Sequence, residues 1–173
     1  MNEDTSRRLN QVDLESIGSL VEKIRQEPQS AKTRWKAEVR WAGGFRSDAR
    51  SRDFAPLHSD EPTGLGGTNT APNPVEQLLA ALGNCLAVGY AANASAAGIE
   101  IRSLRIDLEG EIDLHTFLGL GGDNAGYESI RAVVHLDAGG APEQIQSLHD
   151  KVVGSSPVGH TLSRGVRLKI DLA

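Results

Sequence analysis

Residues 73–86 read NPVEQLLAALGNCL and begin a long apolar helix. Asn73 suits the N-cap, Pro74 suits the first helical position, and Glu76 stands where a capping-box carboxylate belongs. Gly98 suits the C-terminal cap. We therefore predict a helix over residues 74–97. Because it is apolar on nearly all sides, it must be buried at the centre of the fold.

The same helix raises the question of a membrane span. Residues 77–99 contain no charged residue, and the stretch is long enough to cross a bilayer. It is, however, rich in alanine and glycine, includes Gln77, Asn84 and Asn93, and has no close flanking clusters of lysine or arginine. We expect a buried helix in a soluble protein and no membrane partner.

The flanking sequence predicts strands and a second helix. Alternating apolar and polar residues predict strands at 35–41, 104–112, 130–136 and 166–172, and a more polar strand at 45–56. Residues 58–72 have the glycine and proline content of a loop. Residues 141–153 predict a helix with Ile145, Leu148 and Val152 on one face. Because the strands and helices do not alternate strictly, the order indicates an α+β fold.

The central helix also bears on assembly. A single sheet covers one side of a helix, so the other sides need the second helix or another subunit. The sequence therefore predicts a homodimer.

The first 30 residues form a separate feature. Apolar residues recur at helical spacing from Val12 to Ile24, and Pro28 marks the end of this helix. We predict an N-terminal helical extension at residues 1–30 and a main domain at residues 31–173. The helix has one apolar stripe, which must dock on its own domain or on a partner subunit.

Composition excludes several classes of function. The chain has 173 residues, with 18 Lys and Arg against 23 Asp and Glu, so its formal net charge is -5. This acidic balance argues against nucleic-acid binding. The single cysteine allows no intrachain disulfide and favours the reducing cytoplasm.

No metal or cofactor is expected from motifs. The five histidines do not have the close spacing of metal ligands, and the chain has no pair of cysteines that could complete a metal site with them. We therefore interpret the histidines as structural or surface residues. His58 is the least secure of them, because Asp60 and Glu61 crowd the same loop. The glycines at 64, 66 and 67 are not followed by the lysine of a phosphate-binding loop.

In combination, these segments resemble the OsmC/organic hydroperoxide resistance family. Residues 73–86 resemble the first-cysteine helix of the family, and Ala97-Gly98-Ile99 and the strand ending in Glu109-Gly110 resemble the family's segments beyond that helix. Residues 113–120, DLHTFLGL, are similar to one OsmC-like branch, and Ser155-Ser156-Pro157-Val158 corresponds to the second-cysteine region. The resemblance covers about residues 33–172.

The resemblance implies a fold and a reaction. The implied fold is an intertwined homodimer in which antiparallel sheets wrap around two central helices per subunit. The implied reaction reduces organic hydroperoxides. One cysteine thiolate attacks the peroxide and becomes a sulfenic acid, and a second cysteine condenses with it to a disulfide that an external dithiol reduces. An arginine and a glutamate near the first cysteine support this chemistry.

Carried over to this chain, the resemblance makes Cys85 the peroxidatic cysteine. Cys85 lies about three turns into its helix, so the helix N-terminus gives its thiolate little help. The apolar side chains around it, from Leu82, Leu86 and Val88, disfavour the charged thiolate. A cation that stabilises the thiolate must therefore come from elsewhere in the fold. Arg46, which follows the Gly43-Gly44 turn, is the candidate, with Arg50 and Arg52 as rivals. The alternative is that Cys85 is a buried structural residue.

Two positions depart from the family pattern. The catalytic glutamate usually follows the helix-starting proline, but here Val75 holds that place and Glu76 comes one residue later, about 100° further round the helix. Glu76 is thus a candidate for catalysis or for helix capping alone. Ser156 stands where the second cysteine is expected, and a hydroxyl cannot form a disulfide with a sulfenic acid. The chain therefore resembles a branch that lacks the second cysteine, and an oxidised Cys85 needs an external thiol or dithiol.

Two main functions remain open from the sequence, beside a purely structural or interaction role carried by the N-terminal helix. The first is a single-cysteine peroxidase that reduces small apolar hydroperoxides through Cys85, with an apolar pocket at the dimer interface. The second is a non-catalytic module of the same fold that binds an apolar small molecule or senses oxidants. The two differ in thiol chemistry, because only the enzyme needs a reactive thiolate.

Overall fold

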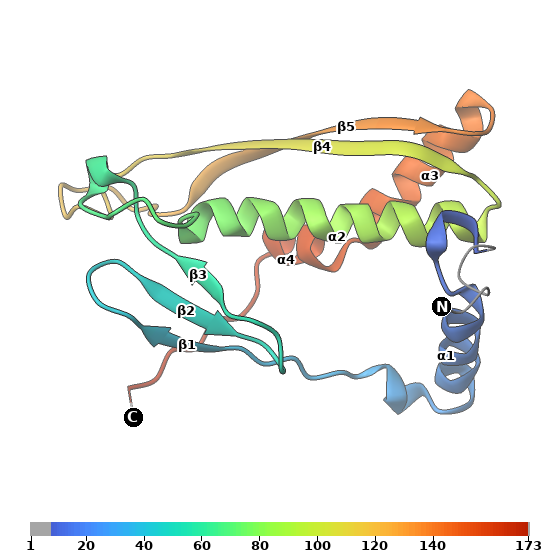
Figure 1. The fold of residues 1–173 in the computed structure, drawn as a ribbon, viewed down its shortest axis with the longest axis horizontal. Helices are drawn as coiled ribbons and strands as arrows, with labels where there is room; N and C mark the ends of the chain where they lie inside the picture. Colours follow the sequence, from blue (N-terminus) through green and yellow to red (C-terminus); the bar gives the residue numbers. More distant parts are fainter. Residues whose placement is uncertain (1–7, 173) are drawn as a thin grey trace. The chain divides into compact units, whose positions relative to one another are not determined.

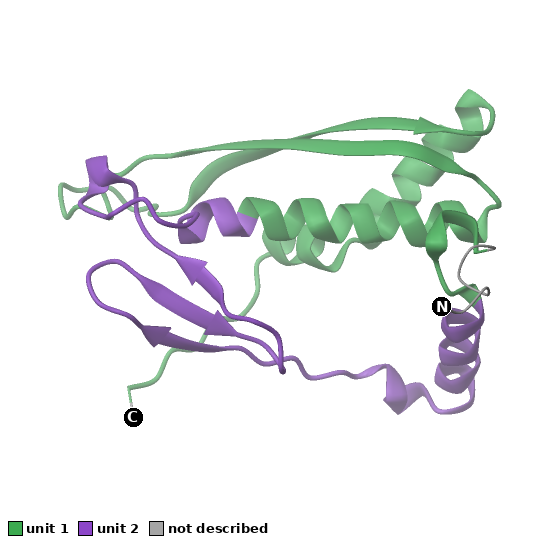
Figure 2. Ribbon diagram, in the orientation of Figure 1, with its two compact units in different colours: residues 1–14, 79–173 green, residues 15–78 purple. Residues whose placement is uncertain are grey.

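The computed structural model describes residues 8–172 of the chain (Figure 1). Contacts divide the chain into two compact units, which Figure 2 shows in green and purple. Unit 1 comprises residues 1–14 and 79–173, and unit 2 comprises residues 15–78. The predicted extension at residues 1–30 and domain at 31–173 describe a different division, which stays a prediction.

The elements confirm the α+β class. Helix α2 (Pro74–Ala96) begins at the end of unit 2 and runs through unit 1. Unit 1 also contains the short 3-10 helix η2 (Leu9–Gln11), the strands β4 (Ile101–Ile112) and β5 (Tyr127–Ala138), and the helices α3 (Pro142–Ser155) and α4 (Pro157–Arg164). The β4–β5 ribbon runs alongside α2 (Figure 1).

Both ends of α2 form as the sequence predicts. The Asn73 backbone N–H donates to the Glu76 carboxylate over 2.8 Å, and the Glu76 N–H donates to the Asn73 side chain over 2.9 Å. At the other end Gly98 takes a φ of +71°, and the Ile99 N–H closes the helix on the Ala94 carbonyl at 2.8 Å. These bonds satisfy backbone groups that a helix leaves unpaired.

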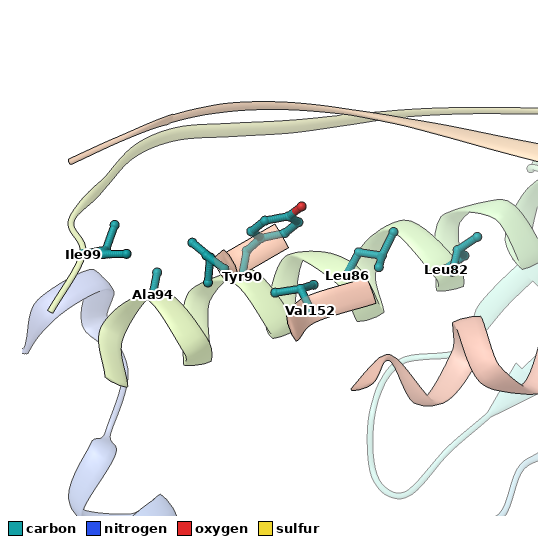
Figure 3. Close-up of a cluster of buried hydrophobic side chains, with 7 residues drawn as sticks. Leu82, Leu86, Tyr90, Ala94, Ile99 and Val152 are labelled. Atoms are coloured by element: carbon teal, nitrogen blue, oxygen red, sulfur yellow. The ribbon is translucent and has the colours of Figure 1, made fainter. Parts of the chain in front are cut away.

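By length and composition alone, α2 is apolar enough to cross a membrane. Core helices of soluble proteins pass the same test. Here one face of α2 is buried, with Leu82, Leu86, Tyr90 and Ala94 packed in the core of unit 1 (Figure 3). Leu148 and Val152 of α3 and Ile99 complete this core cluster.

The strands β4 and β5 pair antiparallel and supply the other side of the core. Leu104 lies opposite Leu136, and Ile106 lies opposite Val134. Because side chains alternate between the faces of a strand, these residues share one face and pack against the core cluster. The opposite face carries polar pairs such as His135 with Asp107, whose Nε2 and Oδ2 are 2.9 Å apart.

The segment before α1 attaches to unit 1 through Asn10. The Asn10 amide donates to Ser95 Oγ over 3.0 Å and to the Ile99 carbonyl over 2.9 Å, and its oxygen accepts the Ile101 N–H at 2.8 Å. Asn10 has a φ of +52°, a conformation that asparagine adopts more readily than most residues. One side chain therefore joins η2 to the turn between α2 and β4.

Unit 2 contains a small antiparallel sheet. Its strands are β1 (Glu38–Trp41), β2 (Ser47–Arg50) and β3 (Leu57–Ser59), in that order across the sheet. Before them lie α1 (Leu14–Gln26) and the short η3 (Pro28–Ala31), and after them lies η4 (Thr63–Leu65). The helix predicted between Val12 and Pro28 is thus confirmed as α1.

Three predictions about strands need correction. Residues 166–172 form no strand and pair with none in the described chain. The strand predicted at 35–41 begins only at Glu38, and it is not half-buried, because Trp41 is 78% exposed. The strand predicted at 45–56 is limited to Ser47–Arg50, and the predicted loop contains β3. Apolar alternation predicts strand conformation, but pairing and burial need a partner surface that this single chain does not supply.

Candidate active site

Cys85 lies on α2 beside a serine from a distant part of the chain. The cysteine is half-buried, and its Sγ is 3.3 Å from Ser156 Oγ. The two residues are brought together because α3 packs on α2 through Leu148 and Val152. Among residues 8–172, Ser156 is the one side chain that hydrogen-bonds to Cys85.

Ser156 occupies the junction between two helices. It ends α3 and caps α4, and its Oγ accepts the Gly159 N–H over 3.1 Å. Pro157 follows at the first helical position, which needs no N–H donor. Only 4% of Ser156 is exposed. The position that resembles the second-cysteine region therefore lies within contact of Cys85 and carries a buried hydroxyl.

A cavity of about 320 Å³ adjoins this pair within unit 1. Its wall is mainly apolar, and its polar groups come from α2, α3 and α4. The lining residues are Leu82, Leu86, Tyr90, Ala132, Val134, His149, Val153, Ser156, Gly159, His160 and Ser163. Ser156 both lines the cavity and contacts the Cys85 sulfur. Only the Ser156 side chain would therefore separate a small apolar molecule in the cavity from the thiol.

Tyr90 and His149 form a polar pair in the cavity wall. A hydrogen bond joins the Tyr90 hydroxyl to His149 Nδ1, and the two rings lie 6.2 Å apart between centroids. Tyr90 is fully buried, and this burial raises its pKa, so its hydroxyl remains neutral. The pair satisfies a buried polar group and stiffens the packing of α2 on α3.

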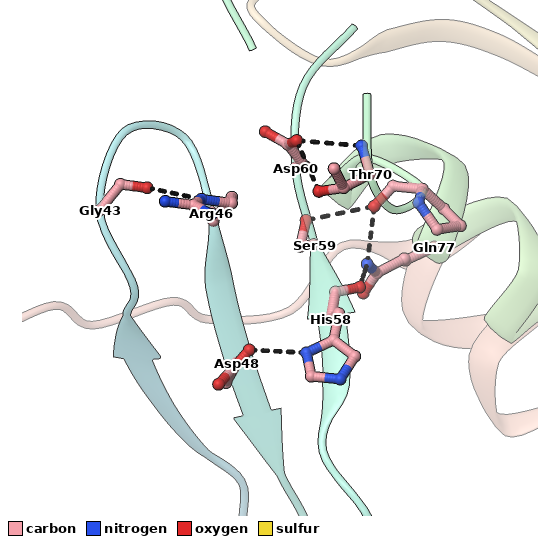
Figure 4. Close-up of polar contacts among 9 residues, drawn as sticks. Gly43, Arg46, Asp48, His58, Ser59, Asp60, Thr70 and Gln77 are labelled. Carbon is pink, nitrogen blue, oxygen red and sulfur yellow. Dashed lines mark hydrogen bonds and ion pairs between the residues drawn. The ribbon is translucent and has the colours of Figure 1, made fainter. Parts of the chain in front are cut away.

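Arg46 lies in unit 2, at the start of β2. Its backbone N–H and its side-chain Nε both donate to the Gly43 carbonyl, over 3.1 and 3.4 Å, and the side chain is exposed (Figure 4). It makes no ion pair within the described residues. A hollow of about 330 Å³ beside it is lined by Asp48, His58 and Thr70, among others. Of the rivals, Arg52 stacks on the Phe54 ring at 4.5 Å, and Arg50 is exposed.

Glu76 is held at the start of α2 by the reciprocal bonds with Asn73. It precedes Cys85 by nine residues on this helix, about two and a half turns. Side chains at that spacing leave a helix on opposite sides. The capping role is therefore established for Glu76, and its catalytic role stays a prediction.

The polar residues around His58 have structural partners. His58 Nδ1 lies 2.8 Å from Asp48 Oδ1 (Figure 4). Glu61 accepts from the Asn73 amide at 3.3 Å. Asp60 is 1% exposed and accepts bonds from Glu61, Thr68 and Thr70. The Thr68 hydroxyl, helped by Thr70 and Glu61, holds the pKa of Asp60 far below its usual range. Within residues 8–172, no group of three or more His, Cys, Asp or Glu side chains is arranged to hold a metal ion.

Two features of the site were missed in the sequence. The helix α4 was not predicted, although Ser156-Pro157 is an N-cap followed by a proline at the first helical position. The Tyr90–His149 bond joins residues 59 positions apart, and no local pattern reports such a contact.

Comparisons with known proteins bear on the family and the fold. A model of the OsmC-like protein family matches residues 67–171. No curated protein matches the sequence of this chain.

Solved structures share the fold. An OsmC-like protein from Mycoplasma pneumoniae is 20% identical with a TM-score of 0.66, over 78% of this chain and 90% of that chain. An organic hydroperoxide resistance protein from Elizabethkingia anophelis is 20% identical with a TM-score of 0.57, over 78% and 92%. An organic hydroperoxide resistance protein OsmC from Legionella pneumophila is 18% identical with a TM-score of 0.54, over 76% and 92%.

The family model spans Cys85, Ser156 and all the residues that line the cavity beside Ser156. Since it also covers more than half of the sequence, this protein belongs to the OsmC-like family.

Proposed function

We propose that this protein is a single-cysteine, thiol-dependent peroxidase that reduces organic hydroperoxides through Cys85. The observation that carries the proposal is a half-buried thiol beside a buried hydroxyl and an apolar cavity. Two similar structures are described as organic hydroperoxide resistance proteins.

The reaction follows from the chemistry of one thiol. The Cys85 thiolate attacks the terminal peroxide oxygen, an S–O bond forms as the O–O bond breaks, and the alkoxide takes a proton to leave as an alcohol. The cysteine is oxidised to a sulfenic acid and the peroxide is reduced. Because Ser156 cannot form a disulfide, an external thiol condenses with the sulfenic acid and releases water. A second external thiol, or the second thiol of a dithiol, then releases free Cys85 as a disulfide forms.

The cavity supports a preference for alkyl substrates. Leu82, Leu86 and Val134 give it an apolar wall, which favours an alkyl chain over water. Hydrogen peroxide has no apolar part to bury there. We therefore propose small organic hydroperoxides as the substrate class.

Arg46 and Glu76 complete the proposal as supporting groups. Arg46 is the exposed cation of unit 2 that we assign to the thiolate, and Glu76 is the carboxylate that we assign to proton handling near the peroxide. Arg46→Gln and Glu76→Gln test these roles. The glutamine at position 76 keeps the capping box while it removes the charge.

We also propose that the protein acts as a homodimer in the cytoplasm, without nucleic-acid or membrane partners. Val88 on α2 is 68% exposed, and the apolar residues of 166–172 have no cover in the described chain. A second copy would bury these surfaces. The net charge of -5 supports the proposal that nucleic acid and membranes are not partners, and the single cysteine supports the cytoplasmic location.

The test is to mix the reduced protein with cumene hydroperoxide and, separately, with hydrogen peroxide. Free thiol and intact mass are followed in time, with Cys85→Ser as the control. We expect rapid formation of a sulfenic acid that is faster with the alkyl peroxide and absent in the control. A reaction no faster than that of an ordinary thiol would exclude the peroxidase.

The alternative is a non-catalytic module that binds an apolar small molecule. The observation that favours it is Ser156, because the chain lacks a residue that would protect a sulfenic acid as a disulfide. This function predicts ligand binding in the cavity that Cys85→Ser leaves unchanged. Calorimetry with the alcohol product of cumene hydroperoxide would detect it.

A further inference from the structure

The contact between Ser156 and Cys85 has only one possible direction when the thiol is ionised. A backbone N–H can only donate, so the Gly159 N–H at 3.1 Å occupies a lone pair of Ser156 Oγ. A serine hydroxyl has one proton. Within residues 8–172, the remaining partner of Ser156 Oγ is the Cys85 sulfur at 3.3 Å. A thiolate has no proton to donate, so in the ionised state of Cys85 the hydroxyl proton points to the sulfur.

Burial makes the Ser156 hydroxyl a stronger hydrogen-bond donor than the hydroxyl of an exposed serine. Only 4% of Ser156 is exposed, so water competes little for the hydroxyl proton. The Gly159 N–H lies in the first turn of α4, where backbone groups carry partial positive charge, and it polarises the hydroxyl towards donation. A thiolate has no proton and can only accept. A hydrogen bond to a charged sulfur is stronger than one to a neutral thiol, so the contact favours the thiolate.

We propose that Ser156 is a positioning residue for the reactive thiol: its hydroxyl, which lines the apolar cavity, donates to the Cys85 thiolate and holds the sulfur one side chain away from the cavity. This inference rests on the proposed function. In this chain the side chain at position 156 stabilises the attacking thiolate, and it does not resolve the oxidised product. Within residues 8–172, no Lys, Arg or His side chain hydrogen-bonds to Cys85, and Ser156 is the side chain that does.

The test measures the rate of alkylation by iodoacetamide as a function of pH. Cys85 is the only cysteine in the sequence, so the rate reports one thiolate. In Ser156→Ala we expect the midpoint of the pH–rate profile to rise by about one pH unit. The rate below the midpoint then falls about tenfold. Ser156→Thr keeps both the hydroxyl and the helix cap, and it should restore the wild-type profile.

Two controls separate the hydrogen bond from folding. Ser155→Ala removes a neighbouring hydroxyl that donates to the Lys151 carbonyl, over 2.7 Å, and it should leave the midpoint unchanged. Ser156→Gly removes the hydroxyl but keeps a residue that caps helices well, so its midpoint should rise as in Ser156→Ala. Circular dichroism checks that each variant is folded.

An unchanged midpoint in Ser156→Ala, or equal shifts in the Ala and Thr variants, would overturn the inference. Because alkylation uses no peroxide, this result is independent of the peroxidase test. A wild-type protein that fails to reduce peroxides while Ser156→Ala still shifts the midpoint would overturn the proposed function and uphold the hydrogen bond.

Discussion

Asp60 is the residue on which the loop after β3 depends. Its carboxylate is buried, and it accepts backbone and hydroxyl donors from Thr68 and Thr70 and the backbone N–H of Glu61. Each of these donors would otherwise need water or another acceptor. The depressed pKa of Asp60 follows from these bonds, first of all the one from the Thr68 hydroxyl.

This depressed pKa predicts how stability depends on pH. A carboxyl group whose pKa is lower in the folded state stabilises the protein above its unfolded pKa, and this contribution is lost as pH falls towards the folded pKa. Asp60→Asn turns an NH₂ group towards the threonine donors, so we expect a lower melting temperature at pH 7. The difference from the wild type should narrow below about pH 4.

Thermal unfolding of both proteins between pH 7 and pH 3 checks this prediction. Glu61→Gln is the control, because it keeps the Glu61 N–H that donates to Asp60. A difference in melting temperature that stays constant with pH would contradict the assignment of the charge to Asp60.

At the scale of elements, glycines decide how closely α2 packs against its neighbours. A Cβ atom at Gly89 would lie 2.9 Å from Val152 Cγ1, and one at Gly83 would lie 2.8 Å from Leu108 Cδ1. These distances are shorter than normal carbon contacts. Gly89 therefore permits the close approach of α3, the helix that ends at Ser156, and Gly83 permits the close approach of β4.

Gly89→Ala should destabilise the protein. Alanine favours the helix by up to about 1 kcal/mol, but the clash with Val152, which is 1% exposed, costs about 1–3 kcal/mol. We expect a net loss of about 1 kcal/mol in the free energy of unfolding, measured with urea. Gly154→Ala on α3 is the matched control: no heavy atom lies within 4 Å of its Cβ position, so it should be neutral or stabilising. Equal effects of the two substitutions would show that packing at Gly89 is not limiting.

At the scale of the whole molecule, the proposed dimer depends on apolar surface that one chain leaves open. Val166, Leu168 and Ile170 are 69%, 77% and 84% exposed, and in the sequence they alternate with Arg167 and Lys169. Such a segment is suited to pairing with the edge of a sheet. Trp41 on β1 is exposed as well, so this strand also lacks cover in the described chain.

The double substitution Leu168→Asp and Ile170→Asp should therefore dissociate the dimer, because each aspartate places a charge in a surface that we expect to be buried. Sedimentation velocity at micromolar protein would show a fall from the mass of two chains to that of one. Aspartate at Arg167 and Lys169 is the control, because these positions lie on the other face of the segment. A wild type that sediments as one chain, or a double variant that remains dimeric, would contradict the prediction.

The sequence by itself determined the features that depend on near neighbours. The capping bonds of Asn73 and Glu76, the Gly98 cap and the alternation in β4 and β5 were all predicted, because each involves residues within a few positions or one strand period. The family was also recognisable from segments spread along the chain, and the match over residues 67–171 agrees with it.

Only the tertiary structure decided which distant side chains meet. Cys85 and Ser156 are 71 residues apart, and Asn10 bonds Ser95 across 85 positions. These contacts arise from the packing of α2, α3 and β4, which depends on the summed shapes of many side chains and leaves no periodic signal. For the same physical reason the alternation at 166–172 predicted a strand that one chain does not form: an extended segment becomes a strand only where a second edge offers it hydrogen bonds.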